Sequence, residues 1–180
     1  MFPADSHESL RPGRPVVHPG RCHTPQVTHP CTSSLAVNGV SLFSSFLDDV
    51  EHVELDTPYG VPSAPIAIGS VGARTVAFLP RHGVDHEFPT HRINYRANIW
   101  ALRSLGVRRA FGPCAVGGLS AVLTPGAMVV PDQLADRTTS RTQTFTDAGA
   151  VHAPFSAPYC PALRGALLAR DARARDRGRW

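Results

Sequence analysis

The pattern of apolar and polar positions separates a folded middle of the chain from its two ends. Residues 1–33 hold six prolines and four histidines with little apolar periodicity, and such a segment buries too little surface to offset the entropy of ordering it. From residue 170 onward, arginine and aspartate alternate to the last residue. We therefore divide the chain into a Pro/His-rich, disordered or aberrant segment (1–45), a folded domain (46–169) and an Arg-rich tail (170–180).

Several segments of the middle part predict β-strands. EHVELD (51–56) alternates apolar and polar residues, as a half-buried strand does. PIAIGSVGARTVAFLP (65–80) predicts two strands joined by a tight turn near Val71–Gly72. The second of these, TVAFL, is apolar almost throughout, which is typical of a strand in a sheet covered on both faces. VRRAFG (107–112) and AMVVPDQ (127–133) predict two more strands.

Two segments predict helices, and their order gives the fold class. Apolar residues recur at helical spacing from about Arg92 to Leu105, and Gly106 provides a helix end. PALRGALLAR (161–170) begins with a proline at a favourable first helical position. Buried strands on either side of a helix indicate an α/β fold, with a mixed and at least partly parallel central sheet flanked by helices.

Charge and composition exclude several classes of function. The length of 180 residues suits one domain, and no apolar run is long enough to cross a bilayer. Ten arginines balance ten acidic residues in 46–169, so the net charge of +4 lies in the ends, and the body offers no basic stripe for nucleic acid. The hypothesis of an arginine-tailed RNA-binding module therefore rests on residues 170–180 alone. Since no secretory signal is recognisable at the start, we expect a cytoplasmic protein.

The cysteines predict neither disulfides nor a metal site. Four cysteines are widely spaced in a chain without a recognisable export signal, where a disulfide framework is not expected. The stretch CHTPQVTHPC offers a possible zinc set, but its spacing fits no known ligand pattern, and chance clustering in a disordered segment is favoured. The residues concerned are Cys22, His23, His29 and Cys31.

A first candidate site follows a predicted buried strand. LPRHGVDHEFPTH (79–91) places Arg81 and His82 at the carboxyl end of that strand, where open α/β sheets bind ligands. The guanidinium fork of arginine suits phosphate, and the following glycine allows close backbone approach. His82, His86 and His91 could alternatively hold a metal, but their spacing is not a recognised ligand set. We predict an anion site here.

Two further segments are candidates of lower specificity. FGPCAVGGLS (111–120) follows another predicted strand, and its small residues expose backbone amides that can bind an anion or face a flat base. Cys114 could act as a nucleophile, but no basic residue is adjacent in sequence, so a small packing residue is the favoured interpretation. The polar segment DQLADRTTSRTQTF (132–145) could line a site or form a surface loop.

Taken together, these segments resemble the purine nucleoside phosphorylase and methylthioadenosine phosphorylase family. The resemblance runs through FLDDVEHVELDTPYGVPSAP, LPRHGVDHEFPTHRINYRANIWALRSLGV, PCAVGGL, VVPDQLADRT and HAPFSAPYCP, and it covers about residues 46–165. RHG and HRINYRANIWAL are its most specific motifs. PCAVGG resembles the bacterial branch, so residues 46–169 are interpreted as a partial nucleoside phosphorylase domain.

The resemblance implies an activity. Members of the family carry out phosphorolysis: inorganic phosphate attacks C1′ of a purine nucleoside, and the products are the free base and ribose 1-phosphate, or its methylthio analogue. This makes the chain a pentosyltransferase by family. Phosphate is a co-substrate, no metal or organic cofactor is used, and members assemble as homotrimers. The partners expected are thus a purine nucleoside, phosphate and two further copies of the chain, without nucleic acid or membrane.

Motif positions also imply residue roles. By resemblance, the phosphate pocket comprises Ser41, Arg81, His82, Cys114 and Ala115. The purine lies against Ala115, Val116 and Gly117, and His152 reaches the 5′ pocket of a neighbouring subunit. The NYRAN helix belongs to the scaffold behind the site.

Two departures from the family pattern favour an alternative. Where the family has a GGSG-like loop, this chain has NGVSLFSSF, so Val40 and Leu42 flank Ser41 in place of glycines. The family's EGPRF-like motif, its NM-containing loop and its late aspartate beside the purine have no counterpart here. We therefore expect a fold without the C-terminal portion of the family. The alternative is a catalytically inactive remnant that retains at most phosphate or nucleoside binding.

Overall fold

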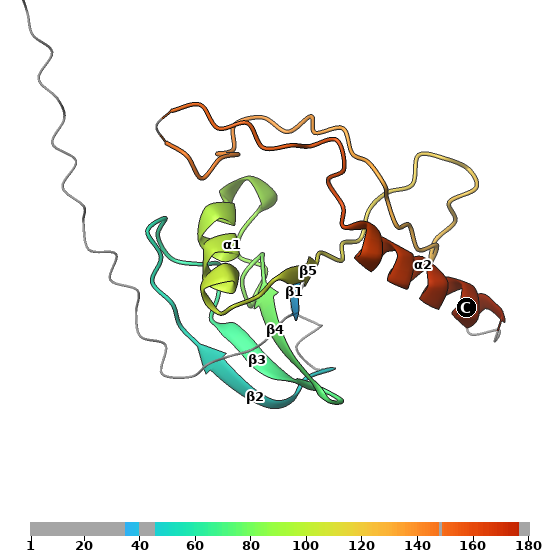
Figure 1. Ribbon diagram of the computed structural model, residues 1–180, viewed down its shortest axis with the longest axis horizontal. Helices are drawn as coiled ribbons and strands as arrows, with labels where there is room; N and C mark the ends of the chain where they lie inside the picture. Colours follow the sequence, from blue (N-terminus) through green and yellow to red (C-terminus); the bar gives the residue numbers. More distant parts are fainter. Residues whose placement is uncertain (1–34, 40–45, 148, 177–180) are drawn as a thin grey trace, which may run out of the picture.

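The computed structural model describes residues 35–39, 46–147 and 149–176. Strands make up most of the first part of the chain, with one α-helix before the last strand, and a long segment without helix or strand precedes the second helix (Figure 1). The elements are β1 (Leu35–Gly39), β2 (Asp48–Val53), β3 (Ile66–Val71), β4 (Arg74–Pro80), the 3₁₀ turn η2 (Thr90–Arg92), α1 (Tyr95–Ser104), β5 (Arg109–Phe111) and α2 (Pro161–Asp176).

Five strands form one mixed sheet in the order β2-β3-β4-β1-β5. β1 pairs in parallel with both β4 and β5, whereas β2, β3 and β4 are antiparallel neighbours. Gly72 closes the β3–β4 hairpin with a positive φ of 57°, a conformation that favours glycine. The predicted mixed, partly parallel α/β sheet and its tight turn near Val71–Gly72 are confirmed.

The hydrophobic core lies between the sheet and α1. Ile66, Ile68, Ala77 and Leu79 point to the same face and pack with Ala101, Leu102 and Leu105 of the helix region. Val76 and Phe78 alternate with them on β4 and are also buried. The expectation of a strand buried on both faces is therefore confirmed for the apolar run of β4.

Two asparagines of the NYRAN motif fix α1 against the loop before β3. Asn94 caps the helix by accepting from the Ala97 N–H, and its amide donates to the Tyr59 carbonyl at 2.7 Å. The fully buried Asn98 accepts from the Ser63 N–H and donates to the Ser63 hydroxyl. The predicted helix is confirmed, with a later start because the Asn94 cap precedes Tyr95.

The structure corrects the predicted start of the folded core. Residues 35–39 were assigned to the N-terminal segment of 1–45, but they form β1 between β4 and β5. Ala36 in this strand is completely buried. Five residues next to a proline-rich stretch gave too short an apolar pattern to predict a strand. The predictions for Ser41 and for the cysteine–histidine stretch lie outside the described residues.

Four other predicted elements differ in the structure. Residues 127–133 form no strand, because no neighbouring strand among the described residues supplies hydrogen-bond partners for their backbone. β2 begins at Asp48, and β5 is limited to three residues. α2 continues through Asp176 into the predicted tail, since alanine, leucine and arginine all favour helix.

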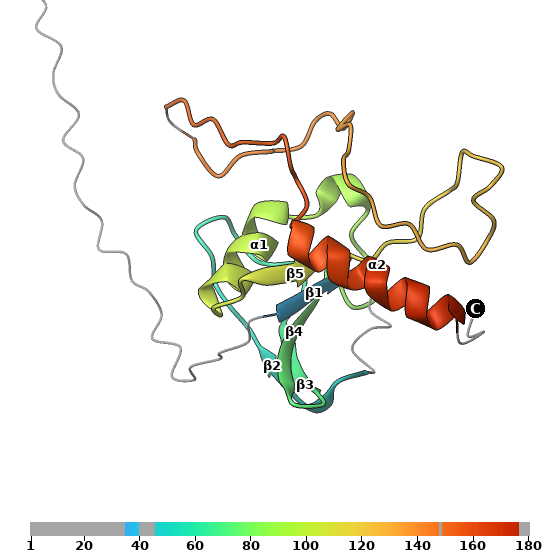
Figure 2. The same cartoon turned by 45° about the vertical axis from the view of Figure 1, so that its right-hand side comes forward.

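The two helices occupy different surroundings. α1 lies against one face of the sheet, whereas α2 projects at the side of β1 and β5, away from β2 (Figures 1 and 2). Within the described parts of the chain, neither helix combines the length and the apolar composition of a membrane span.

Candidate functional site

The carboxyl ends of three parallel strands meet at one edge of the sheet. Gly39 at the end of β1 is in register with Pro80 at the end of β4, and Val37 of β1 is in register with Phe111 at the end of β5. The segments that follow these strands therefore emerge side by side. Such an edge is where open α/β sheets bind ligands.

Arg81 holds these three strand ends together. Its backbone N–H donates to the Gly39 carbonyl at 3.1 Å. Its guanidinium Nη1 donates to the Asn38 carbonyl at 2.9 Å and to the Pro113 carbonyl at 3.0 Å. No other described residue bonds to Nε or Nη2, so these nitrogens keep donors for an anion. Arg81 is thus both fixed in place and chemically able to bind phosphate.

His82 is oriented by the chain that follows it. Its Nδ1 lies 2.9 Å from the Phe88 carbonyl oxygen, and its ring stacks on His86 with centroids 6.1 Å apart. Because a carbonyl only accepts, Nδ1 carries the proton, and Nε2 is the nitrogen left for a ligand or solvent.

The glycine of RHG is required by the turn. Gly83 has a φ of 84°, and its N–H donates to the Pro80 carbonyl at 3.0 Å. A Cβ at this position would collide with the Glu87 carboxylate, which accepts from the Asp85 N–H. The turn therefore needs glycine for its backbone conformation, while the flexible Glu87 side chain could move aside, and the turn sets the direction of Arg81 and His82.

The small-residue turn is tied to the site only at its start. Pro113 accepts from Arg81, but Cys114 and the three residues after it are exposed. Val116 is 76% exposed, and nothing lies within 4 Å of where a Cβ of Gly117 would be. The structure thus brings the first part of PCAVGG to Arg81 and leaves the proposed purine-facing part uncovered.

His152 lies on the long segment before α2, away from the three strand ends in sequence. It is exposed, and no described residue forms a hydrogen bond with its ring. Its predicted place in the 5′ pocket of a neighbouring subunit stays a prediction.

Asn38 adds a group that the sequence analysis missed. Its side-chain Oδ1 is buried, and it has no hydrogen-bond partner among the described residues. A buried carbonyl oxygen without a partner is costly, and this one belongs to the residue just before the end of β1. An amide side chain in an otherwise apolar strand pattern, LAV followed by Asn, was the available sequence clue.

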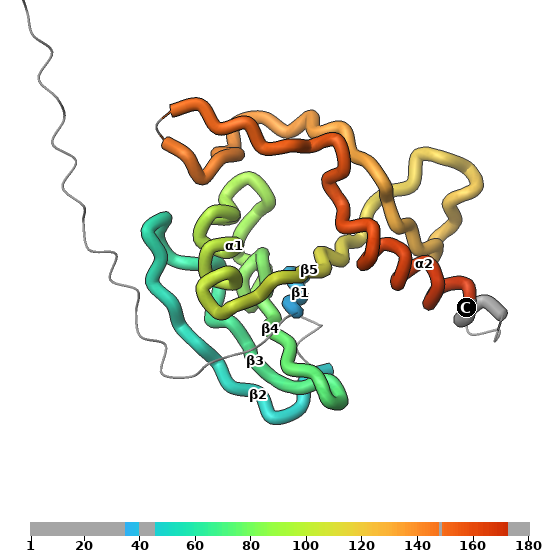
Figure 3. The backbone as a smooth tube through the Cα atoms, in the orientation of Figure 1, coloured from blue at the N-terminus to red at the C-terminus, as the bar shows by residue number. Residues whose placement is uncertain are grey.

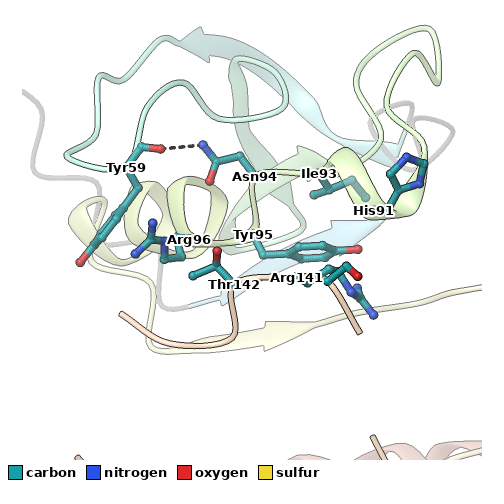
Figure 4. A pocket seen from close by; sticks show the side chains of 9 residues that line it. Tyr59, His91, Ile93, Asn94, Tyr95, Arg96, Arg141 and Thr142 are labelled. Carbon is teal, nitrogen blue, oxygen red and sulfur yellow. Dashed lines mark hydrogen bonds between the residues drawn. The ribbon is translucent and has the colours of Figure 1, made fainter. Parts of the chain in front are cut away.

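A hollow on the surface lies apart from Arg81 and His82. It measures about 320 Å³ and lies between the start of α1 and the 140–142 loop (Figure 4). The Arg96 guanidinium lies 4.8 Å from the centre of the Tyr59 ring, and that of Arg141 lies 5.1 Å from the Tyr95 ring. The lining residues are Tyr59, His91, Ile93, Asn94, Tyr95, Arg96, Ser140, Arg141 and Thr142.

These contacts fasten the polar segment 132–145 and its neighbours to the core. Arg96 pairs with Asp147 at 2.8 Å, and the Tyr59 hydroxyl donates to the Phe145 carbonyl. Within the segment, hydrogen bonds from the Thr138 hydroxyl and backbone, with the charge of Arg141, hold the pKa of Asp136 below its ordinary value. Of the two alternatives for this segment, the structure gives a surface loop that lines the hollow.

Among the described residues, no group of three histidine, cysteine, aspartate or glutamate side chains is arranged to hold a metal ion. His82 and His86 are neighbours, but they stack on each other and do not converge on a common point with a third such side chain.

Comparison with known proteins gives consistent results. A model of the phosphorylase superfamily matches residues 40–179. S-methyl-5'-thioadenosine phosphorylase of Mycobacterium tuberculosis is 58% identical over 131 residues, which are 73% of this chain and 50% of the relative. Purine nucleoside phosphorylase of Streptomyces coelicolor is 52% identical over 153 residues, covering 80% of this chain and 54% of the relative.

Solved structures agree with this. A methylthioadenosine phosphorylase from an antarctic soil metagenomic library superposes with a TM-score of 0.76 at 38% identity, over 79% of this chain and 51% of that one. Methylthioadenosine phosphorylase from Schistosoma mansoni in complex with tubercidin gives 0.72 at 34% identity, over 81% and 53%. The chain spans about half the length of the curated relatives that it matches.

Proposed function

Because the chain belongs to the phosphorylase superfamily, we propose that its strand-end site serves the phosphorolysis of a purine nucleoside, with 5′-methylthioadenosine the foremost candidate. The observation that carries this proposal is the position of Arg81. Two carbonyls hold its Nη1 where the ends of β1, β4 and β5 meet, and its Nε and Nη2 have no partner among the described residues. The names of the relatives, methylthioadenosine phosphorylase and purine nucleoside phosphorylase, support the same reaction.

The proposed chemistry needs phosphate to be oriented and shielded from water. Arg81 donates to phosphate through Nε and Nη2, the backbone amides of Cys114 and Ala115 add donors, and the Ser41 hydroxyl completes the pocket. A phosphate oxygen forms a bond to C1′ while the C1′–purine nitrogen bond breaks. The electron pair leaves with the purine, which takes up the proton of the phosphate. Fixed donors lower this barrier because they need no reorganisation when charge moves.

The nucleoside half of the pocket is proposed to lie over the small-residue turn. The purine stacks against Ala115, Val116 and Gly117, and His152 reaches the 5′ pocket of a neighbouring copy in a homotrimer. Phosphate is the co-substrate, and no metal or organic cofactor takes part. We keep the cytoplasm as the expected location.

A second candidate function is phosphate binding without turnover. It is favoured by one observation: the residues proposed to face the purine are exposed and uncovered, whereas Nη1 of Arg81 is held by two carbonyls. In that case the chain binds phosphate and leaves the nucleoside intact.

A coupled phosphorolysis assay separates the two candidates. Methylthioadenosine, adenosine and inosine are incubated with the purified chain, with and without phosphate, and base release is measured. Phosphorolysis predicts phosphate-dependent release that falls about a hundredfold or more in Arg81→Lys, since lysine loses the planar fork of donors. Arg103→Ala is the matched control, because Arg103 is an exposed arginine of α1 whose side chain forms no hydrogen bond or ion pair among the described residues. Circular dichroism verifies folding, and release that does not depend on phosphate would contradict the proposal.

A further inference from the structure

The hollow at the start of α1 is formed by two segments that are distant in sequence. The polar segment that contains residues 140–142 passes beside the beginning of α1 (Figure 3). Residues 140–142 form one wall of the hollow, and residues 91–96 form another (Figure 4). Its volume of about 320 Å³ is in the range of sites that hold small molecules. None of the residues assigned to the strand-end site lines it.

The lining of this hollow is polar and carries no negative charge. It includes three basic residues, His91, Arg96 and Arg141, and no aspartate or glutamate. Ser140 and Thr142 add hydroxyl groups, and neither hydroxyl is hydrogen-bonded within the described chain. Cationic side chains together with hydroxyl donors are the groups that bind the oxygens of phosphate.

Arg141 is fixed in position without using its hydrogen-bond donors. It is partly buried, and its guanidinium lies 5.1 Å from the centre of the Tyr95 ring. Tyr95 is itself held, because its hydroxyl donates to the Thr90 carbonyl at 2.9 Å. The ring face attracts the cation, but no described oxygen accepts from any of its five N–H groups. Leaving these donors unmatched in a partly buried position is costly, and an anion would satisfy them.

Arg96 is a second cation held at the hollow, and it also fastens the loop. Its guanidinium lies 4.8 Å from the centre of the Tyr59 ring, and Nη1 donates to the Asp147 carboxylate at 2.8 Å. Its Nε and Nη2 form no hydrogen bond within the described chain. The Tyr59 hydroxyl donates to the Phe145 carbonyl, so the loop is joined to the core twice without Arg141.

The acidic residue near Arg141 does not occupy its donors. Asp136 attracts Arg141 through its charge. However, the two oxygens of this carboxylate accept from the Thr138 hydroxyl at 2.7 Å and from the Gln143 amide at 3.0 Å. Since neither the attachment of the loop nor an ion pair uses the Arg141 guanidinium, its donors remain available to a ligand in the hollow.

From these observations we propose that this hollow is a second anion site, which takes the phosphate ester of a small polyol, such as a sugar phosphate. The phosphate oxygens accept from the guanidinium of Arg141 and from the imidazole of His91. The hydroxyl groups of the polyol exchange hydrogen bonds with Ser140 and Thr142. The site is separate from the strand-end site, so the proposal does not depend on the proposed activity.

The same lining disfavours an aromatic ligand. The rings of Tyr59 and Tyr95 each carry a guanidinium on one face, so these faces are not free to stack on a base. Ile93 is the one aliphatic residue of the lining, and it is only 6% exposed. A ligand therefore gains little from apolar contact and must bind through its phosphate and hydroxyl groups.

The location of binding is tested by NMR on the full 180-residue chain, with ribose 5-phosphate as the probe. The backbone amide signals of Tyr95 and of residues 140–142 should shift saturably, and ribose without phosphate should leave them in place. The amide signals of residues 81–83 report separately on the strand-end site. Shifts confined to residues 81–83, or no saturable shift at residues 140–142, would overturn the proposal.

Matched variants test the role of the guanidinium. Arg141→Ala should weaken the binding of ribose 5-phosphate seen at residues 140–142 at least tenfold, because its donors are the main charged contact. Arg137→Ala removes an exposed arginine of the same segment that does not line the hollow, and the dissociation constant should stay unchanged. Arg81→Lys should leave it unchanged as well. Equal weakening by Arg141→Ala and Arg137→Ala, or none by Arg141→Ala, would overturn the proposal. A chain that binds ribose 5-phosphate here but releases no base would contradict the proposed function alone.

Discussion

The described chain consists of two regions that differ in how they use their apolar residues. In residues 35–39 and 46–111, apolar side chains from β1, β3, β4 and α1 are buried in one core, and both side-chain polar atoms of the buried Asn98 form hydrogen bonds. In residues 112–147 and 149–176, large apolar side chains remain exposed, and polar contacts fasten the segment to the rest. The first region is stabilised by its own sequence, whereas the second lacks a covering partner within the described residues.

The residues of the candidate site are divided between the same two regions. Arg81 and His82 belong to the first region and are oriented by backbone carbonyls. Ala115, Val116, Gly117 and His152 belong to the second and make no such contacts. The proposed phosphate half of the site is therefore preorganised, and the proposed nucleoside half is not.

Replacing the same residue type in the two regions should give the largest contrast. Phe78 is 2% exposed on β4, so Phe78→Ala should reduce the free energy of unfolding by about 3–5 kcal/mol through lost burial and a cavity. Phe155 is 58% exposed, and Phe155→Ala should change it by less than about 0.5 kcal/mol. Urea denaturation followed by circular dichroism measures both, and similar losses would contradict the division into two regions.

The buried asparagine of α1 should give the next largest effect. Asn98→Ala removes two hydrogen bonds and leaves the Ser63 N–H and hydroxyl without partners, which should cost about 2–3 kcal/mol. Gln133→Ala removes a hydrogen bond to the Ser156 carbonyl in the second region and should cost less than about 0.5 kcal/mol. The same denaturation experiment checks this, and an Asn98→Ala variant as stable as the parent would refute the role assigned to NYRAN.

The sequence predicted the first region better than the second for a physical reason. The β3–β4 hairpin and α1 have local patterns strong enough to be read directly: a continuous apolar run, a glycine at the turn and helical spacing ended by Gly106. β1 was missed because five residues carry little periodicity, and its place in the sheet depends on pairing with β4 and β5, which are distant in sequence.

The strand expected over 127–133 is the reverse case, since its pattern predicts a strand that does not form. Its apolar pattern is suitable for a strand, but a strand forms only when another supplies hydrogen bonds, and none does among the described residues. For the site, the sequence indicated Arg81 and His82 as ligand-binding residues. It could not indicate that the Arg81 guanidinium also joins the ends of β1 and β5, since that requires the contacts to Asn38 and Pro113.

The smallest expected effect concerns the exposed loop of the second region. The pKa of Asp136 is lowered chiefly by its hydrogen bonds from Thr138. A carboxyl whose pKa is lower in the folded state contributes stability above its unfolded pKa, and this contribution is lost as the pH falls through the folded value. Thr138→Ala should therefore raise the pKa of Asp136 toward its ordinary value. Titration by NMR of the aspartate carboxyl measures this, with Thr139→Ala as the control.

Phosphate binding to the intact chain, measured by isothermal titration calorimetry, tests the central claim most directly. If the phosphate half is preorganised and the nucleoside half is uncovered, phosphate binds saturably without nucleoside, Arg81→Lys weakens binding about tenfold or more, and His152→Ala leaves it unchanged. Methylthioadenosine alone then binds far more weakly to the chain than phosphate does. A folded chain that binds no phosphate, or that binds it equally well after Arg81→Lys, would contradict the account.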